Sequence, residues 1–97
     1  MFEVSVHETG EIILSGRFDA IQVEKAKSVF DTIQATTKVN FRDLEYISSA
    51  GLGVLLATQK RLNHAGHGLQ LINLNKYVLN VFQYAGFDNI FKIEKSI

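Results

Sequence analysis

Two adjacent serines, Ser48 and Ser49, stand where an apolar strand pattern changes to a helical one. A serine at such a junction is a natural N-cap, because its hydroxyl accepts a hydrogen bond from an unpaired N–H of the first turn. Those N–H groups also carry the positive end of the helix dipole, which favours an anion such as a phosphate. Gly51 and Gly53 keep the same turn bare, so a partner surface could approach the backbone there. The serine pair is therefore predicted either to cap the helix or to carry a phosphate on Ser49.

The same stretch lacks the residues that three enzyme motifs require. A nucleophile elbow needs Gly-x-Ser-x-Gly, but Ile47 stands at its first position. A phosphate-binding P-loop needs Gly-Lys-Ser/Thr, but Val54 follows Gly53, and Leu56 replaces the third glycine of a dinucleotide fingerprint. The chain is therefore predicted not to be an enzyme. Nucleotide binding at this loop is a hypothesis of another class, which a nucleotide titration would test.

The histidines are predicted to be solvated rather than metal-binding. His64 and His67 have a spacing found among metal ligands, but Gly66 between them disfavours a stable helical face. The chain contains no cysteine, so thiolate ligands, cysteine nucleophiles and disulfides are all excluded. We expect two loop histidines, an exposed strand residue at His7, and neither metal nor cofactor.

Length and charge indicate one domain that binds a protein. The 97 residues allow a single core, so one domain over residues 1–97 is predicted. Ten basic and ten acidic residues are scattered without a basic stripe, which argues against a nucleic-acid partner. No apolar run approaches the ~18–20 residues that would span a bilayer. The acid-containing N-terminus is not a signal peptide, so a cytoplasmic location without membrane insertion is expected.

Alternation of polar and apolar residues predicts the strands. The first two, residues 2–7 and 11–16, flank the turn Thr9-Gly10 and are predicted to form a hairpin. Gly16-Arg17-Phe18-Asp19 is predicted to leave the sheet. Further strands are expected at residues 38–42, 69–74 and 90–93.

Apolar residues at intervals of three and four predict three helices. The first carries its stripe over residues 23–33 and is expected to end at Ala35-Thr36-Thr37. The second follows the serines and runs to about Leu62, and Asn75 is the predicted N-cap of the third. The apolar positions are Val23, Ala26, Val29, Phe30 and Ile33, then Leu52, Leu55, Leu56 and Leu62, with Gln59 on the same face, and finally Val78, Val81, Phe82 and Ala85.

The order of elements, ββαβαβαβ, indicates an α/β fold. Strands that alternate with helices require parallel neighbours and right-handed crossovers. We therefore predict a mixed sheet whose later strands are parallel, with helices packed on it.

The stretch Ser48-Ser49-Ala50-Gly51-Leu52 resembles the signature of the STAS domain, and in particular of small bacterial anti-sigma-factor antagonists, where the loop reads Asp-Ser-Ser/Thr-Gly-Leu. Ser49 falls on the phosphoacceptor, Ser48 stands in the place of the Asp, and Ala50 replaces the second Ser/Thr. Gly16-Arg17-Phe18-Asp19 is similar to the family's Gly-x-Leu/Phe-Asp turn. The resemblance thus covers nearly the whole chain and implies the STAS fold.

The resemblance implies that the domain works by partner switching. The unphosphorylated domain is expected to bind an anti-sigma factor that is also a serine kinase, which frees a sigma factor for transcription. Phosphorylation of Ser49 would end the binding, a serine phosphatase would restore it, and the domain itself would bind no DNA. The alternative within the same fold is a constitutive subunit of another assembly, such as a lipid-transport ATPase complex, in which Ser49 is only a helix cap. The oligomeric state stays open.

The predicted partner-binding residues surround the phosphoacceptor. By residue type, Asp19 is a helix-capping acid and Asp43 a structural turn residue. The resemblance places Asp19 on the partner-facing surface beside the serine loop. Leu52 belongs either to the core stripe or, partly exposed, to the centre of an interface. The full predicted set is Asp19, Ser48, Ser49, Gly51 and Leu52.

Overall fold

The computed structural model describes residues 1–94, which form one five-stranded sheet and three α-helices. The predicted order ββαβαβαβ is confirmed, with one added 3₁₀ turn, η1 (Ala20–Gln22), before the first α-helix. The predicted domain also includes residues 95–97, which lie outside the described residues. The strands are β1 (Phe2–Val6), β2 (Ile12–Phe18), β3 (Thr37–Ile47), β4 (Leu69–Ile72) and β5 (Lys92–Glu94), and the helices are α1 (Val23–Phe30), α2 (Ser49–His64) and α3 (Lys76–Tyr84).

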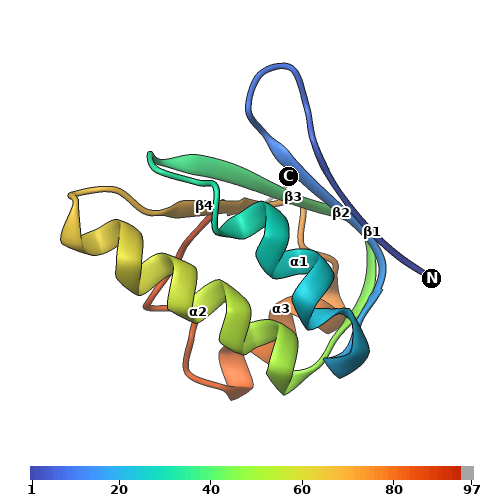
Figure 1. The fold of residues 1–97 in the computed structure, drawn as a ribbon. Coiled ribbons are helices and arrows are strands. Elements are labelled where there is room, and N and C mark those ends of the chain that lie inside the picture. Colours follow the sequence, from blue (N-terminus) through green and yellow to red (C-terminus); the bar gives the residue numbers. More distant parts are fainter. Residues whose placement is uncertain (95–97) are drawn as a thin grey trace.

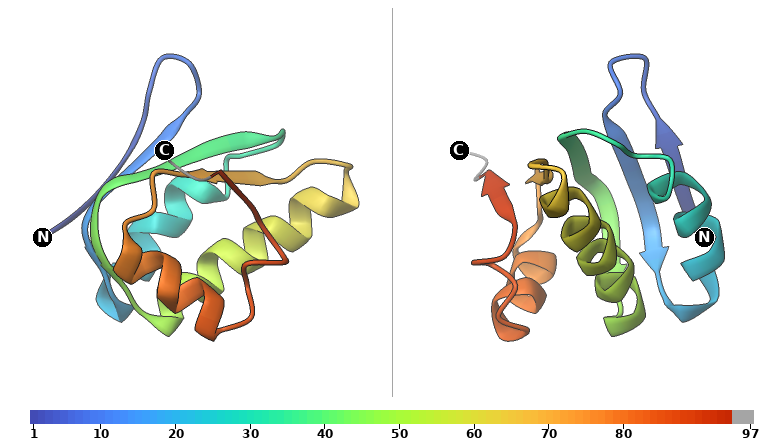
Figure 2. Two further views of the ribbon diagram at one scale, coloured as in Figure 1. Left: turned by 180° about the vertical axis from the view of Figure 1, so that it is seen from behind. Right: turned by 60° about the vertical axis from the view of Figure 1, so that its left-hand side comes forward.

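The strands lie in the order β1-β2-β3-β4-β5, with β1 antiparallel to β2 and every later pair parallel. The three helices cover one face of this sheet, and α2 lies between α1 and α3 (Figures 1 and 2). Side chains in β3 therefore alternate between two environments: Val39 and Phe41 are buried, whereas Lys38 is exposed and Asn40 half-buried. The face of the sheet without helices is mostly polar.

The core fills the space between the covered face of the sheet and the helices. Phenylalanines dominate it: Phe2 stacks on Phe18 with ring centroids 4.7 Å apart, and Phe82 meets both Phe41 and Phe91 edge-on at 5.9 and 5.7 Å. Such pairs add about 0.5–1.5 kcal/mol each beyond the area they bury. Phe18 is the last residue of β2, so the core extends to the end of the sheet where α2 begins.

Strands β2 and β3 are longer than predicted. β2 continues through Gly16 to Phe18, and β3 continues past Arg42 to Ile47. The parallel register between them shifts twice, and each shift inserts an extra residue into β3. These bulges break the alternation of burial, so that Arg42 and Asp43 are exposed one after the other. A strand with such a break does not show the period-two pattern on which the prediction relied.

Helix α1 is shorter than predicted, and a side chain of α2 binds the backbone carbonyls at and just after its end. It ends at Phe30 rather than near Ala35. The Arg61 guanidinium of α2 donates hydrogen bonds to the carbonyls of Phe30 and Ile33, at 2.9 and 2.7 Å. Ile33 is still buried in the core, although it lies outside the helix.

Smaller differences occur at the last two strands. β4 ends at Ile72, two residues early, because Asn73 adopts a positive φ of 60° that a strand cannot continue. β5 begins at Lys92 instead of Ile90, since the N–H groups of Ile90 and Phe91 bond back to the carbonyl of Phe87. Among residues 1–94, no helix has both the length and the apolar character needed to cross a membrane.

Candidate functional site

Asp19 and Ser48 lie side by side because they follow the ends of two paired strands. The last residues of β2 and β3, Phe18 and Ile47, are register partners, and the Ser48 N–H donates to the Phe18 carbonyl at 2.9 Å. Asp19 is half-buried, and its Oδ1 accepts a hydrogen bond from the Ile21 N–H at 3.2 Å. The predicted capping role of Asp19 is confirmed, at the 3₁₀ turn η1.

The two serines have different positions in the helix. Ser48 is the N-cap: its Oγ accepts from the Gly51 N–H at 3.2 Å, and its carbonyl accepts from the Leu52 N–H at 2.9 Å. Ser49 is the first residue of α2, and it is exposed. The hypothesis that Ser49 is only a helix cap is therefore wrong, because Ser48 makes the capping bond. The Ser49 hydroxyl lies outside that bond, at the positive end of the helix dipole.

Replacing Ser48 with alanine is expected to destabilise the domain, whereas Ser49→Ala is expected to change its stability little. Removal of the Ser48 hydroxyl leaves the Gly51 N–H without its acceptor, and loss of an N-cap side chain costs about 1 kcal/mol. In a domain of this size, that corresponds to a melting temperature about 4–8 °C lower. Thermal unfolding of the two variants beside wild type measures the difference. Equal losses in both variants would contradict the assignment of the cap.

The glycines of the first turn also differ from each other. Gly51 is buried, and a Cβ built on it would lie 3.0 Å from Phe18 Cγ and 3.1 Å from the Phe18 carbonyl oxygen. The expectation that Gly51 leaves the backbone open to a partner is therefore wrong: it is small because the end of β2 packs against it. Gly53 is the exposed glycine, with open space where its Cβ would be.

For Leu52 and Asp43, one expected position of each residue is wrong. Leu52 is 5% exposed and packs in the core, so the hypothesis of a partly exposed leucine is wrong and the core alternative is confirmed. Asp43 is not in a turn: it lies within β3, opposite Ser15 of β2, at the first bulge. Its side chain is exposed on the strand.

A largely apolar groove lies between the start of α2 and α3, and we call it the α2–α3 groove. Its volume is about 560 Å³, and Ser49 and Leu52 form part of its α2 side. On the α3 side, Tyr77 is 52% exposed and Tyr84 is 96% exposed. None of the residues that line the groove is charged. Its lining residues are Ser49, Leu52, Tyr77, Asn80, Val81, Tyr84 and Ala85.

Sequence analysis missed the two tyrosines of this groove. Tyr77 and Tyr84 are seven residues apart, about two helical turns, so they lie on the same side of α3. The spacing of seven residues indicates an aromatic stripe on α3, whereas the apolar periodicity of this helix predicted only the face that packs in the core. Tyr77 also stacks on Tyr46 of β3 at 6.3 Å, and the Arg17 guanidinium lies 4.3 Å from the centroid of the Tyr46 ring. This row of contacts connects the groove to the ends of β2 and β3.

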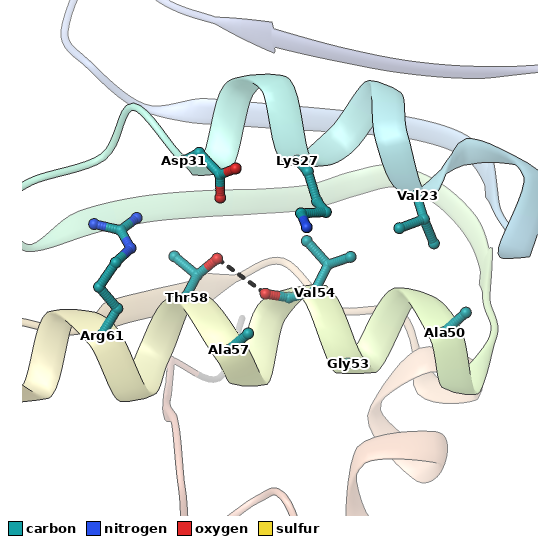
Figure 3. Close-up of a pocket in the computed structure, with 9 residues that line it drawn as sticks. All are labelled: Val23, Lys27, Asp31, Ala50, Gly53, Val54, Ala57, Thr58 and Arg61. Carbon is teal, nitrogen blue, oxygen red and sulfur yellow. Dashed lines mark hydrogen bonds between the residues drawn. The ribbon is translucent and has the colours of Figure 1, made fainter.

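A second groove, the α1–α2 groove, lies on the opposite side of α2 (Figure 3) and has a volume of about 440 Å³. Its floor is formed by small or apolar side chains of α2. The charges of this groove are carried by Lys27 of α1, by Asp31 directly after the end of α1, and by Arg61 of α2. The nine residues that line it are labelled in Figure 3.

No histidine lines either of the two grooves. The predicted loop position is wrong for His64, which is the exposed last residue of α2. His67 does lie in the following loop, with its Nδ1 3.4 Å from the Thr36 hydroxyl. Across residues 1–94, no three His, Asp, Glu or Cys side chains are grouped closely enough to hold a metal ion.

Comparison with known proteins identifies the family. The family described as "Mlab, STAS domain" matches residues 3–94, nearly all of the chain. The chain belongs to the STAS domain family. This confirms the resemblance seen in the serine loop. The STAS domain is 33% identical over 85 residues to BtrV of Bordetella bronchiseptica, provisionally named an anti-sigma factor antagonist; the match covers 88% of this chain and 72% of BtrV.

Solved structures share the fold of this STAS domain. A Thermotoga maritima protein, also provisionally named an anti-sigma factor antagonist, has a TM-score of 0.79 at 22% identity, over 100% of this chain and 88% of its own. The anti-sigma factor antagonist SpoIIAA in its unphosphorylated form has a TM-score of 0.72 at 19% identity, over 100% and 90%. The phosphorylated form of SpoIIAA, from Bacillus, has a TM-score of 0.69 at 20% identity, over 99% and 93%. The predicted α/β STAS fold is therefore confirmed.

Proposed function

We propose that this STAS domain is an anti-sigma-factor antagonist, and that phosphorylation of Ser49 switches its binding off. The unphosphorylated domain binds an anti-sigma factor that is also a serine kinase, and a sigma factor is thereby freed. A serine phosphatase reverses the modification. The observation that carries the proposal is the position of Ser49: it is exposed, outside the capping bond, and on the edge of an uncharged groove.

The position of Ser49 would allow a phosphate to act on a partner without unfolding the domain. A phosphate adds roughly −1.5 to −2 charges at neutral pH. At the first residue of α2 it gains about 0.3–1 kcal/mol from the helix dipole, so the helix tolerates it. A partner packed into the α2–α3 groove would have to bury that charge among apolar side chains, which is unfavourable without a paired cation. Phosphorylation would thus expel the partner and leave the fold intact.

The proposed partner surface combines the serine turn with its neighbours. Asp19 and Ser48 lie at the ends of β2 and β3, and Ser49 connects them to the groove. Gly51 and Leu52 are buried, so their proposed part is to shape the turn and the wall of the groove. Names of relatives support an anti-sigma factor as the partner, since BtrV and SpoIIAA are both described as antagonists of such factors.

Ser49→Asp is expected to lower the affinity for the partner at least tenfold, because it places a fixed negative charge where the partner packs. A pull-down from native-cell lysate uses wild type, Ser49→Ala and Ser49→Asp as baits, and the recovered partner is then purified for titration. Wild type and Ser49→Ala should retain a protein with a kinase-type ATP-binding domain, and Ser49→Asp should lose it.

The matched control is Ser28→Asp, which adds the same charge at an exposed serine of α1 outside both grooves. It should bind the partner as wild type does. If all of these baits retained the same partner with equal affinity, the phosphate switch would be refuted and the constitutive subunit would become the better hypothesis.

A further inference from the structure

The α1–α2 groove has a floor of small side chains that keeps it open. Ala50, Gly53 and Ala57 follow one another along the groove side of α2 (Figure 3). Apart from its chain neighbours and the backbone of its own helix, nothing lies within 4 Å of the position that a Cβ on Gly53 would occupy. From Ala50 to Arg61 the groove follows α2 for about 16 Å, or three helical turns. That length suits another helix laid beside α2.

The walls of the groove are held in place by contacts at both ends of α1. At its C-terminal end, Arg61 donates to the carbonyls of Phe30 and Ile33. Toward its N-terminal end, Lys25 donates to the Phe2 carbonyl at 2.9 Å and lies 3.1 Å from the Glu3 carboxylate. The groove is therefore present before any partner binds, which lowers the entropic cost of binding.

Two opposite charges on the α1 wall have no ion-pair partner within residues 1–94. Lys27 lies in α1, and Asp31, four residues further on, is the capping residue directly after its C-terminal end; both side chains extend toward the space between the helices (Figure 3). The guanidinium of Arg61 adds a second positive charge at the far end, although two of its N–H groups donate to backbone carbonyls. The groove thus has a net positive charge, set over an apolar floor.

We infer that the α1–α2 groove receives an amphipathic helix of the anti-sigma factor, which carries a carboxylate opposite Lys27 and small or aliphatic side chains against Ala50, Gly53 and Ala57. This inference rests on the proposed function, because it adds a second contact for the same partner. Continuity favours this occupant: Ala50, at one end of the groove, directly follows Ser49, so a protein that covers the serine turn reaches the groove without a gap. The charge of the groove selects an acidic helix over a basic one.

Reversing the charge of Lys27 tests this inference. In titrations with the purified partner, Lys27→Glu is expected to weaken binding about tenfold, and Lys27→Gln by a smaller factor. Lys60→Glu is the matched control, since Lys60 is an exposed lysine of α2 outside the groove. It should bind as wild type does. Circular dichroism of each variant establishes that the fold is retained.

A fluorescent label inside the α1–α2 groove tests independently whether the partner covers the groove. The chain has no cysteine, so Ala57→Cys provides a single site for an environment-sensitive fluorophore, with Lys60→Cys as the exposed control. Partner binding should shift the emission of the Ala57 probe to the blue and leave the Lys60 probe unchanged. A shift that appears without partner and fades on dilution would overturn the inference, because it would assign the groove to a second copy of this chain.

The two proposals fail in different ways. If wild type captures no anti-sigma factor, the proposed function fails and the inference with it. If wild type binds the partner and Ser49→Asp does not, while Lys27→Glu binds normally and the Ala57 probe is unchanged, only the inference about the α1–α2 groove is refuted.

Discussion

Replacing Gly51 with valine is expected to lower the free energy of unfolding by about 3 kcal/mol or more, because the new side chain has no room. A Cβ at this position would lie 3.0 Å from both Phe18 Cγ and Ile47 Cγ1, and 3.1 Å from the Phe18 carbonyl oxygen. That carbonyl is fixed, since it accepts the hydrogen bond from the Ser48 N–H. The larger side chain must therefore displace the end of β2 or the start of α2. Urea unfolding of the purified variant measures the loss.

Gly53→Val is the matched control, two residues along the same helix. A Cβ on Gly53 has no neighbour within 4 Å, and valine forms helices somewhat better than glycine. Gly53→Val should therefore be as stable as wild type or slightly more stable. If Gly51→Val and Gly53→Val unfolded at the same urea concentration, the close packing of Gly51 against Phe18 would be refuted.

Gln59→Leu is expected to destabilise the domain by about 2–4 kcal/mol, although leucine has a similar size and the site is buried. Gln59 is 5% exposed, and both ends of its amide are used. Its Oε1 accepts from the Leu69 N–H at 2.7 Å, and its Nε2 donates to the Ile90 carbonyl at 2.9 Å. Leucine would leave these two backbone groups without partners. Because a domain of this size has a total stability of roughly 5–10 kcal/mol, the loss should be easily measured by urea unfolding.

Hydrogen exchange locates the effect of Gln59→Leu. The Leu69 amide should exchange faster in the variant than in wild type, since its acceptor is gone. Gln83→Leu, at an exposed position of α3, should change neither the stability nor that amide. Unchanged protection of the Leu69 amide in Gln59→Leu would show that the Gln59 side chain does not hold the start of β4.

Features that depend on near neighbours in the chain were predictable. Strands and helices repeat their apolar residues every two or three to four positions, so the order of elements followed from the sequence. Capping also concerns only the next two or three residues: Asp19 and Asn75 cap as expected, and one serine of the predicted pair, Ser48, caps α2. The family signature lies in one such short stretch, which is why Ser49 was found without a structure.

Features that depend on contacts between distant segments were not predictable from one sequence. The two bulges in β3 arise from its register with β2, and the last carbonyl of α1, that of Phe30, is bound by Arg61, thirty-one positions further along the chain. The burial of Gly51 could not be predicted either, because Phe18, which packs against it, lies thirty-three positions earlier in the chain.

The sequence alone therefore determined the α/β order, the helix caps and the candidate phosphoacceptor, because each depends on local periodicity or on hydrogen bonds within one turn. Only the tertiary structure decided which surfaces are available. It buried Leu52, exposed Tyr77 and Tyr84 on one groove, and left Lys27 and Asp31 over another. The reason is that a groove exists only where two helices pack at a given distance, and that distance is set by side chains of both helices and of the sheet beneath them.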